Sequence, residues 1–117
     1  MTSTDLIHQK CLPCEGGVEP LKPSEFKIYL ESVDHWQVIE DNKKIQKEFT
    51  FKNFREVLKV VNQIGEIAES EGHHPDLNIH DFKKLTVMLW THAIGGLSIN
   101  DFILAACLVG CKKKKFV

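Results

Sequence analysis

Residues 71–102 read EGHHPDLNIHDFKKLTVMLWTHAIGGLSINDF, and we expect the rest of the chain to be organised around this stretch. Four of the six histidines lie in it: His73, His74, His80 and His92. Apolar and polar residues alternate on either side of Asp81-Phe82, which predicts two strands joined by a turn. Three of the histidines fall where these strands meet loops, and loops held by a rigid scaffold often carry function. The stretch is therefore the first place to look for chemistry.

The composition is that of an ordinary soluble domain. The 117 residues are 43% hydrophobic and 26% charged with a formal net charge of -1, so we expect no surface built for nucleic acid. No apolar run of about 18 residues occurs, and the N-terminus MTSTDLIHQK lacks the apolar region of a signal peptide. We therefore expect one cytoplasmic domain with neither a membrane nor a nucleic-acid partner.

The segment before the histidine-rich stretch predicts a helix, a hairpin and a second helix. Ser24 is suited to cap a first helix over residues 24–33. Two strands follow, joined at Asp41-Asn42, which favour a turn. Thr50 is suited to cap a long second helix whose apolar residues recur every three or four positions, and Gly72 is suited to end it. The apolar side of this helix should lie across the sheet.

The last helix completes the predicted fold. Gly95-Gly96 predicts a turn, and Ser98 with Asp101 three residues later has the pattern of a capping box that opens a helix. The predicted order is α-β-β-α-β-β-α. This order favours an α+β fold, a four-stranded antiparallel sheet with three helices packed on one face.

The two ends of the chain differ from the middle. Proline and glycine break any periodicity in residues 1–23, which predicts an irregular arm before a single domain over 24–111. Residues 112–117 form a basic tail, whose four lysines either aid solubility or contact an anionic partner. The four cysteines are Cys11, Cys14, Cys107 and Cys111. In a reducing compartment they should be thiols, and a four-cysteine zinc site that joins the chain ends is the alternative.

The histidines suggest acid–base chemistry. His73 and His74 lie between the end of a helix and a strand, and His92 ends the neighbouring strand, so strand pairing can bring them to one pocket. An imidazole both gives and takes protons near neutral pH, and two of them can eliminate water without a cofactor. Trp90 could stack on a flat heterocycle, and the preferred alternative is that it lies partly in the core. Asp101 could orient the loop that carries His92 as well as cap its helix.

The alternative for the histidines is a hydrolytic zinc site. No HExxH or HxH spacing is present, and adjacent histidines on one loop seldom reach the same ion. His80 is followed by Asp81, so we expect it to be exposed or paired locally. The acid–base interpretation is therefore preferred, with no metal expected.

The motif EGHHPDL, followed after one strand by LWTHAIGGLS and NDFILAA, resembles the pterin-4a-carbinolamine dehydratases. The resemblance runs from about Leu21 to Val109, and the arm with CLPCEGGV is similar to that of bacterial members. An HHP element, an aromatic residue, a TH dipeptide and a downstream Asp all occur in the family's order.

The resemblance implies a lyase that needs no cofactor. It would remove water from 4a-hydroxytetrahydropterin to give quinonoid dihydropterin, the recycling step for aromatic amino acid hydroxylases such as phenylalanine hydroxylase. The implied catalytic residues are His73, His74 and His92, with His73 and His92 transferring protons and His74 mainly binding substrate. The implied substrate-binding residues are His73, His74, Pro75, Thr91, His92, Ala93 and Ile94. The supporting residues are Asp76, Trp90 and Asp101.

The chain departs from the animal members of the family at several positions. Ala93 and Ile94 stand where those members have a polar or acidic residue and a cysteine, so only backbone contacts are expected from them. Gly72 replaces an acidic residue that could orient His73. We hypothesise that Asp76 takes over that role.

The resemblance also implies self-association, as homodimers or homotetramers. Animal relatives double as coactivators that bind a homeodomain transcription factor, so a binding module is the alternative from another functional class. A role in molybdopterin metabolism is a further alternative. The sequence leaves open which pterin side chain is native.

Overall fold

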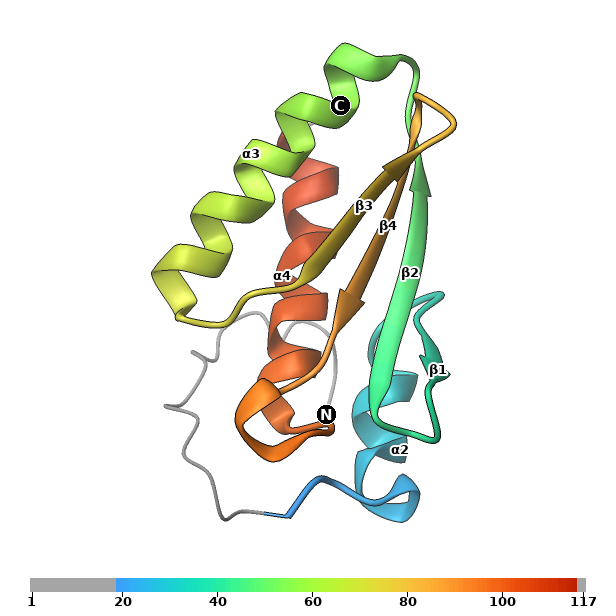
Figure 1. Cartoon of the computed structure of the whole chain (residues 1–117), viewed down its shortest axis with the longest axis vertical. Coiled ribbons are helices and arrows are strands. Elements are labelled where there is room, and N and C mark those ends of the chain that lie inside the picture. The colour runs from blue at the N-terminus through green and yellow to red at the C-terminus, as the bar shows by residue number, and fades with distance from the viewer. Residues whose placement is uncertain (1–18, 116–117) are drawn as a thin grey trace.

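The computed structural model describes residues 19–115, with side chains for residues 19–108. Its elements follow the predicted order, with one extra turn of 3₁₀ helix, η1 (Figure 1). They are α2 (Pro23–Glu31), β1 (Gln37–Ile39), β2 (Lys44–Thr50), α3 (Phe54–Glu71), β3 (Asp76–His80), β4 (Lys84–Leu89), η1 (His92–Ile94) and α4 (Ile99–Lys115). No helix within the described residues is both long and apolar enough to cross a membrane.

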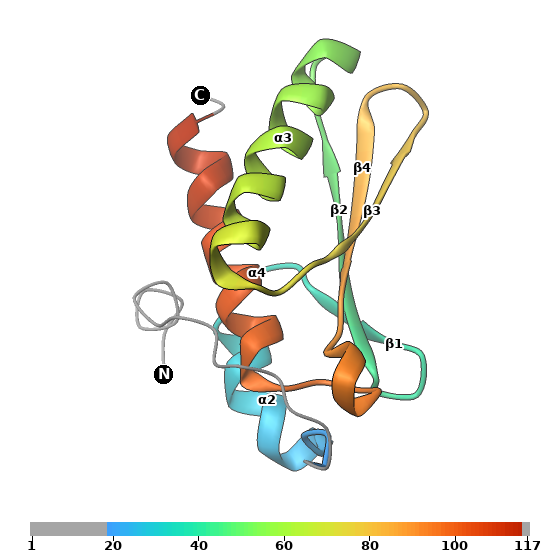
Figure 2. The same cartoon turned by 60° about the vertical axis from the view of Figure 1, so that its left-hand side comes forward.

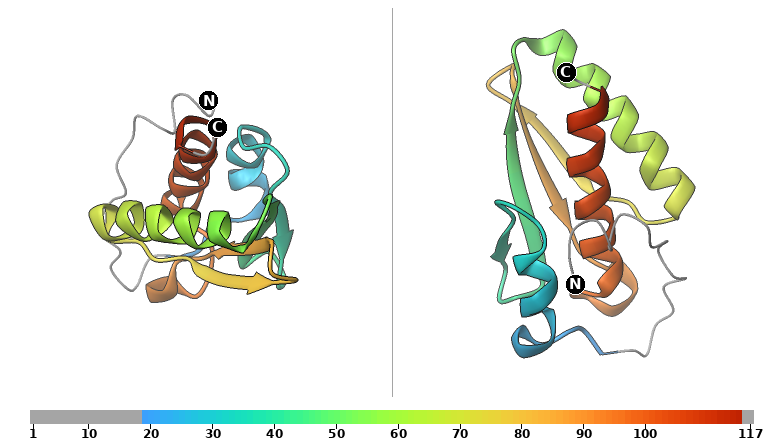
Figure 3. Two further views of the ribbon diagram at one scale, coloured as in Figure 1. Left: turned by 90° about the horizontal axis from the view of Figure 1, so that it is seen from above. Right: turned by 180° about the vertical axis from the view of Figure 1, so that it is seen from behind.

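The four strands form one antiparallel sheet in the order β1-β2-β4-β3. The three helices lie on one face of this sheet and leave the other face uncovered (Figures 2 and 3). The alternation in β4 explains this arrangement, because Leu85, Val87 and Leu89 are fully buried while Lys84, Thr86 and Met88 between them are only partly buried. The α+β fold predicted from the sequence is confirmed.

The helix starts differ from those predicted. Helix α3 is capped by Asn53, whose side chain accepts a hydrogen bond from the Glu56 backbone N–H at 2.9 Å. Thr50, the predicted cap, is instead the last residue of β2, paired with Lys84. Both Thr and Asn side chains can cap a helix. Which of the two residues caps α3 therefore depends on where the pairing between β2 and β4 ends.

Helix α2 also starts and ends earlier than the predicted 24–33. It begins at Pro23 and ends at Glu31, because the Lys22 backbone N–H donates to the Glu25 carboxylate at 2.8 Å and Pro is well suited to the first helical turn. At the other end of the chain, helix α4 continues to Lys115 and so includes the lysines assigned to the tail. The division into arm, domain and tail remains a prediction.

Turns occur where the sequence predicted them. Asp41 and Asn42 have positive φ values of 53° and 66° in the connection between Ile39 and Lys44, and Asp81 and Phe82 have 50° and 49° in the connection between His80 and Lys84. Gly72 ends α3 in the left-handed conformation with φ of 64°. The chain then turns directly into the histidine pair.

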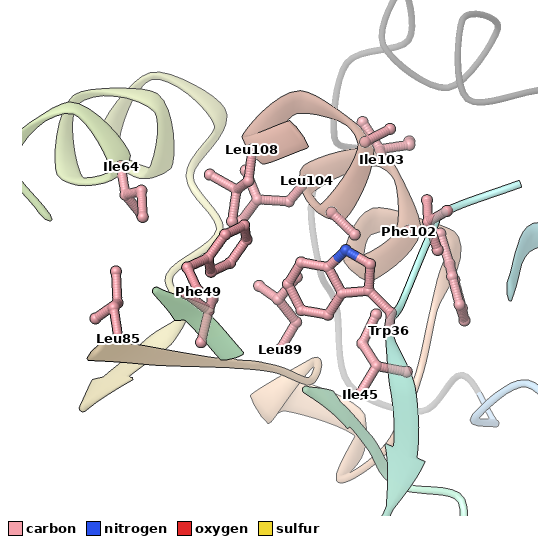
Figure 4. Packing of buried hydrophobic residues seen from close by; sticks show 14 of the residues in the cluster. Trp36, Ile45, Phe49, Ile64, Leu85, Leu89, Phe102, Ile103, Leu104 and Leu108 are labelled. Carbon is pink, nitrogen blue, oxygen red and sulfur yellow. The ribbon is translucent and has the colours of Figure 1, made fainter. Parts of the chain in front are cut away.

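The core lies between the sheet and the helices, with α4 as its largest helical contributor (Figure 4). Trp36 meets Phe49 edge to face at 6.4 Å between ring centroids, and the ring of Phe102 on α4 stacks on Phe26 of α2 at 6.0 Å. The first turns of α4 are almost wholly buried, from Asn100 to Ala106. This packing fixes the start of α4, including Asp101, against the end of the sheet where β4 stops.

Candidate active site

His73, His74 and His92 meet at one pocket. It has a volume of about 270 Å³ and is lined by Gly72, His73, His74, His92 and Ala93. The meeting follows from the topology, because β3 and β4 are antiparallel neighbours and the loop that enters β3 therefore lies beside the loop that leaves β4 (Figure 1). The shared pocket predicted from the sequence is present.

A larger hollow of about 640 Å³ lies at the start of α3 and is lined by Asn53, Phe54, Arg55 and Leu58. Its lining contains one permanent cation and no residue that exchanges protons near neutral pH. The smaller pocket with its three histidines is therefore the better candidate for catalysis.

A buried carboxylate, Asp101, binds one of the histidines that line the pocket. Its Oδ1 lies 2.6 Å from His73 Nε2, and its Oδ2 accepts hydrogen bonds from Thr91 Oγ1 and the Ser98 backbone N–H, each at 2.9 Å. Asp101 is 0% exposed and His73 is 5% exposed. One side chain on α4 thus connects the loop before β3 with the loop after β4.

The directions of these hydrogen bonds can be assigned from the donors available. The Thr91 hydroxyl donates to Asp101, so the 2.7 Å contact with Ser98 Oγ is one in which Ser98 donates to Thr91. Ser98 Oγ in turn accepts from the Asn100 backbone N–H at 3.2 Å. One half of the predicted capping box is present, because Asp101 accepts from the Ser98 backbone N–H, whereas Ser98 Oγ caps Asn100 instead of Asp101. Asp101 also binds Thr91, the neighbour of His92.

The contact with Asp101 selects the proton arrangement of the His73 ring. A carboxylate accepts, so His73 Nε2 carries the hydrogen that it donates. The nitrogen protonated in a neutral imidazole is the one that makes such a hydrogen bond. Nδ1 is therefore the nitrogen of the neutral His73 ring that carries no hydrogen.

His92 is held differently, by a ring stack. It is the first residue of η1 and is exposed. Its imidazole stacks on the indole of Trp90 with 4.1 Å between ring centroids and 21° between planes. The Trp90 Nε1–H donates to Asp76 Oδ2 at 3.2 Å.

These contacts bear on two expectations. A partly core position was preferred for Trp90 over stacking on a flat ligand, and its half-buried indole stacks on a histidine of the pocket. Asp76 was expected to orient His73, but that carboxylate binds the indole of Trp90, and His73 is bound by Asp101. Strand alternation explains the difference, because Asp76 pairs with Met88 on the uncovered face of the sheet, away from α4.

The family comparison agrees with this geometry. The family model for pterin 4 alpha carbinolamine dehydratase matches residues 19–109. The chain belongs to this family.

Relatives in several bacteria share the family's sequence over almost their whole length. A protein of Chlorobaculum tepidum is 42% identical over 104 residues, covering 87% of this chain and 93% of the relative. One from Rickettsia canadensis is 48% identical over 104 residues, covering 88% of this chain and 94% of the relative. A crystal structure of a transcriptional coactivator/pterin dehydratase from Brucella melitensis is 27% identical, with a TM-score of 0.72 over 79% of this chain and 97% of that chain.

Some of the remaining family positions line the pocket and others lie around it. His74 is on the exposed rim, where its Nε2 lies 3.1 Å from Glu69 Oε1. Thr91 is buried beneath the loop, and Pro75 and Ile94 are half-buried. Of the residues that the resemblance added to the histidines, Ala93 is the one that lines the pocket. The substrate-binding roles of all these residues remain predictions.

His80 lies outside the site, as expected. Its Nδ1 is 3.0 Å from Asp81 Oδ2 and its Nε2 is 2.9 Å from Thr86 Oγ1, at the end of the β3–β4 hairpin (Figure 1). The hydrogen bond from His80 lowers the pKa of Asp81, and the charges of His80 and Lys84 add to this while partial desolvation opposes it. His80 is thus paired locally.

The zinc alternatives gain no support from the described side chains, because no three His, Cys, Asp or Glu among residues 19–108 are grouped so that they could hold a metal. Cys107 is half-buried against the core. Cys11 and Cys14 lie outside the described residues, as does the side chain of Cys111. A role for these cysteines remains untested.

Proposed function

We propose that this protein is a hydro-lyase that removes water from 4a-hydroxytetrahydropterins to give quinonoid dihydropterins. The observation that carries the proposal is the single pocket lined by His73 and His92, in which His73 is held by a buried carboxylate. The family is named for this dehydration. Two imidazoles in one pocket provide the acid and the base that the reaction needs.

The elimination requires two proton movements and one bond cleavage. The hydroxyl on C4a takes a proton and leaves as water with the C–O bonding electrons. The adjacent ring N–H loses its proton, and its bonding electrons form the new C=N double bond. No oxidant or reductant enters, so histidine side chains are sufficient for the chemistry.

We assign the base to His73 and the acid to His92. His73 Nε2–H donates to Asp101, so Nδ1 is the atom that takes the proton, and the buried carboxylate stabilises the imidazolium that forms. His92 is an exposed residue in the lining of the same pocket and can regain its proton from water. Each transfer is worth roughly 10²–10⁴-fold in rate.

The surrounding residues support binding. His74, paired with Glu69 at the rim, is placed to contact the polar edge of a pterin ring, and Ala93 offers a small wall that leaves room for it. Pro75 and Ile94 contribute through the backbone, and Thr91 supports the loop from below. The wider role that we propose is the one that the family resemblance implies, recycling of the pterin used by aromatic amino acid hydroxylases such as phenylalanine hydroxylase. We further propose that the protein acts in the cytoplasm as a homodimer or homotetramer.

The test is the dehydration rate of 4a-hydroxytetrahydropterin generated in situ by a hydroxylase, measured after metal chelation. We expect chelator-resistant activity in the wild type and a fall of at least about a hundredfold in His73→Ala and in His92→Ala. His80→Ala is the matched control, because this histidine is also bound to an aspartate but lies at the other end of the sheet. It should keep full activity.

Two outcomes would contradict the proposal. Full activity in both His73→Ala and His92→Ala would place the chemistry elsewhere. A folded wild type without turnover would favour the alternative of a binding module.

A further inference from the structure

The exposed histidine of the pocket depends on one aromatic contact for its orientation. Among the described residues, no hydrogen bond or ion pair holds the His92 imidazole, whereas the His73 imidazole is fixed by Asp101. An exposed side chain on a 3₁₀ turn samples several rotamers unless a neighbour restricts it. The stack on Trp90, at 4.1 Å and 21°, is the contact that restricts this one.

Trp90 is itself held firmly from two sides. Its indole N–H donates to Asp76 Oδ2 at 3.2 Å, across the strands from β4 to the start of β3. Lys44 Nζ lies 4.7 Å from the centre of the indole ring and comes from the start of β2. An aromatic ring fixed by a hydrogen bond and a cation is a rigid platform. The side chains of three strands thus define where His92 can lie.

We propose that Trp90, oriented by Asp76, is a positioning residue that holds the His92 imidazole in the geometry required for proton transfer. The inference rests on the proposed function and adds a role that acts through His92 rather than on the substrate. It also gives Asp76 a task in the site that differs from orienting His73. The face of Trp90 that stacks on His92 is thereby used by the catalytic residue and not by the pterin.

A positioning role has a specific kinetic signature. A displacement of about 1 Å in a reacting group can cost on the order of a hundredfold in rate. Trp90 is not among the residues that line the pocket, so removing the indole should take away no direct contact with the pterin. Removing the platform should therefore lower kcat and leave KM nearly unchanged, which is the pattern of an interaction that matters in the transition state.

The first experiment compares Trp90→Leu with Trp90→Phe in the dehydration assay. Trp90→Leu removes the flat ring, and we expect kcat to fall roughly 10- to 100-fold, with KM changed by less than about threefold. Trp90→Phe keeps a ring to stack on and should recover most of the rate. Trp36→Phe is the matched control, because it changes the other tryptophan, which lies in the core beside Phe49. It should leave kcat unchanged.

Asp76 provides an independent test of the chain of contacts. The amide oxygen of Asp76→Asn can still accept from the indole N–H, so this variant should behave as the wild type. Asp76→Ala removes the acceptor and should lower kcat by about as much as Trp90→Phe. If Asp76 acted on His73 through its charge instead, Asp76→Asn and Asp76→Ala would be equally impaired.

Fluorescence tests the stack directly and does not depend on mutating Trp90. In a Trp36→Phe background Trp90 is the remaining tryptophan. A protonated imidazole in contact with an indole quenches its emission. We therefore expect the emission to rise when His92→Ala is added in mildly acidic buffer, and not to rise when His80→Ala is added.

The outcomes separate this inference from the proposed function. Failure of the wild type, or full activity in His92→Ala, would overturn the proposed function. An active wild type with an impaired His92→Ala, but with wild-type kcat in Trp90→Leu, would overturn only the positioning role. Unchanged Trp90 emission on removal of His92 would also overturn it.

Discussion

Replacing Asp101 by Asn should reverse the proton arrangement of the His73 ring. The wild-type carboxylate accepts from His73 Nε2 at 2.6 Å and from Thr91 and Ser98 at 2.9 Å. In the variant the amide oxygen can keep the bonds from Thr91 and Ser98, and its NH₂ group then faces His73 Nε2. His73 must accept there and carry its proton on Nδ1, the atom that should act as the base.

The size of the effect follows from the role of the proton transfer. Loss of one acid–base partner removes roughly 10²–10⁴-fold in kcat, or about 2.7–5.4 kcal/mol at 1.36 kcal/mol per factor of ten. The fold exchanges hydrogen bonds to a charged carboxylate, each worth about 1.5–3 kcal/mol, for hydrogen bonds to a neutral amide, each worth about 0.5–1.5 kcal/mol. The variant should therefore be folded but less stable than the wild type. The fall in kcat, expressed as a free energy, should exceed the fall in the free energy of unfolding.

Two measurements on purified Asp101→Asn check this: the dehydration rate well below the unfolding midpoint, and thermal unfolding followed by circular dichroism. Asp81→Asn is the matched control, because Asp81 also binds a histidine, His80, at 3.0 Å but far from the pocket. It should keep the wild-type rate. A rate for Asp101→Asn within about threefold of the wild type would refute the assignment of His73 as a base held by Asp101.

Two stability predictions follow from other parts of the fold. In Gly96→Ala the new Cβ would lie 2.6 Å from Pro20 Cβ, so thermal unfolding should show a free energy of unfolding lower by about 1–3 kcal/mol. Gly65→Ala in α3 has open space around the new Cβ, so its free energy of unfolding should rise by about 0.5–1 kcal/mol. Equal midpoints for the two variants would contradict this. His80 lowers the pKa of Asp81, so the ionised carboxylate stabilises the fold above its unfolded pKa of about 3.9, and this effect is lost as the pH falls below that value and through the lower folded pKa. The unfolding midpoints of wild type and Asp81→Asn should differ at pH 6 and converge towards pH 3, and a gap that widened on acidification would count against the pair.

The elements were predictable because their signals are local. Alternation through Leu85, Val87 and Leu89 predicted a half-buried strand, and Gly72 predicted the end of a helix that its left-handed conformation confirms. Helix starts were less certain, since Thr50 and Asn53 are both capable caps. Pairing of Thr50 with Lys84 kept Thr50 in the sheet and left the cap to Asn53.

The candidate site was predictable in its histidines and not in their partners. The positions of His73 and His92 at the ends of adjoining strands were enough to place them in one pocket. For His73 the nearer carboxylate, Asp76, was the expected partner, and the observed one is Asp101, 28 residues away. The capping pattern at Asp101 was the available signal, but it accounts for only one of the two carboxylate oxygens.

The sequence by itself therefore determined the order of the elements, their buried faces and the residues that can exchange protons, because these depend on neighbours within a turn or a strand. The tertiary structure alone decided which polar groups meet. Strand alternation directs Asp76 to the uncovered face of the sheet, where it binds Trp90, while burial of the first turn of α4 brings Asp101 under His73. Such pairings depend on how a helix docks against a sheet, and packing of many distant side chains decides that docking.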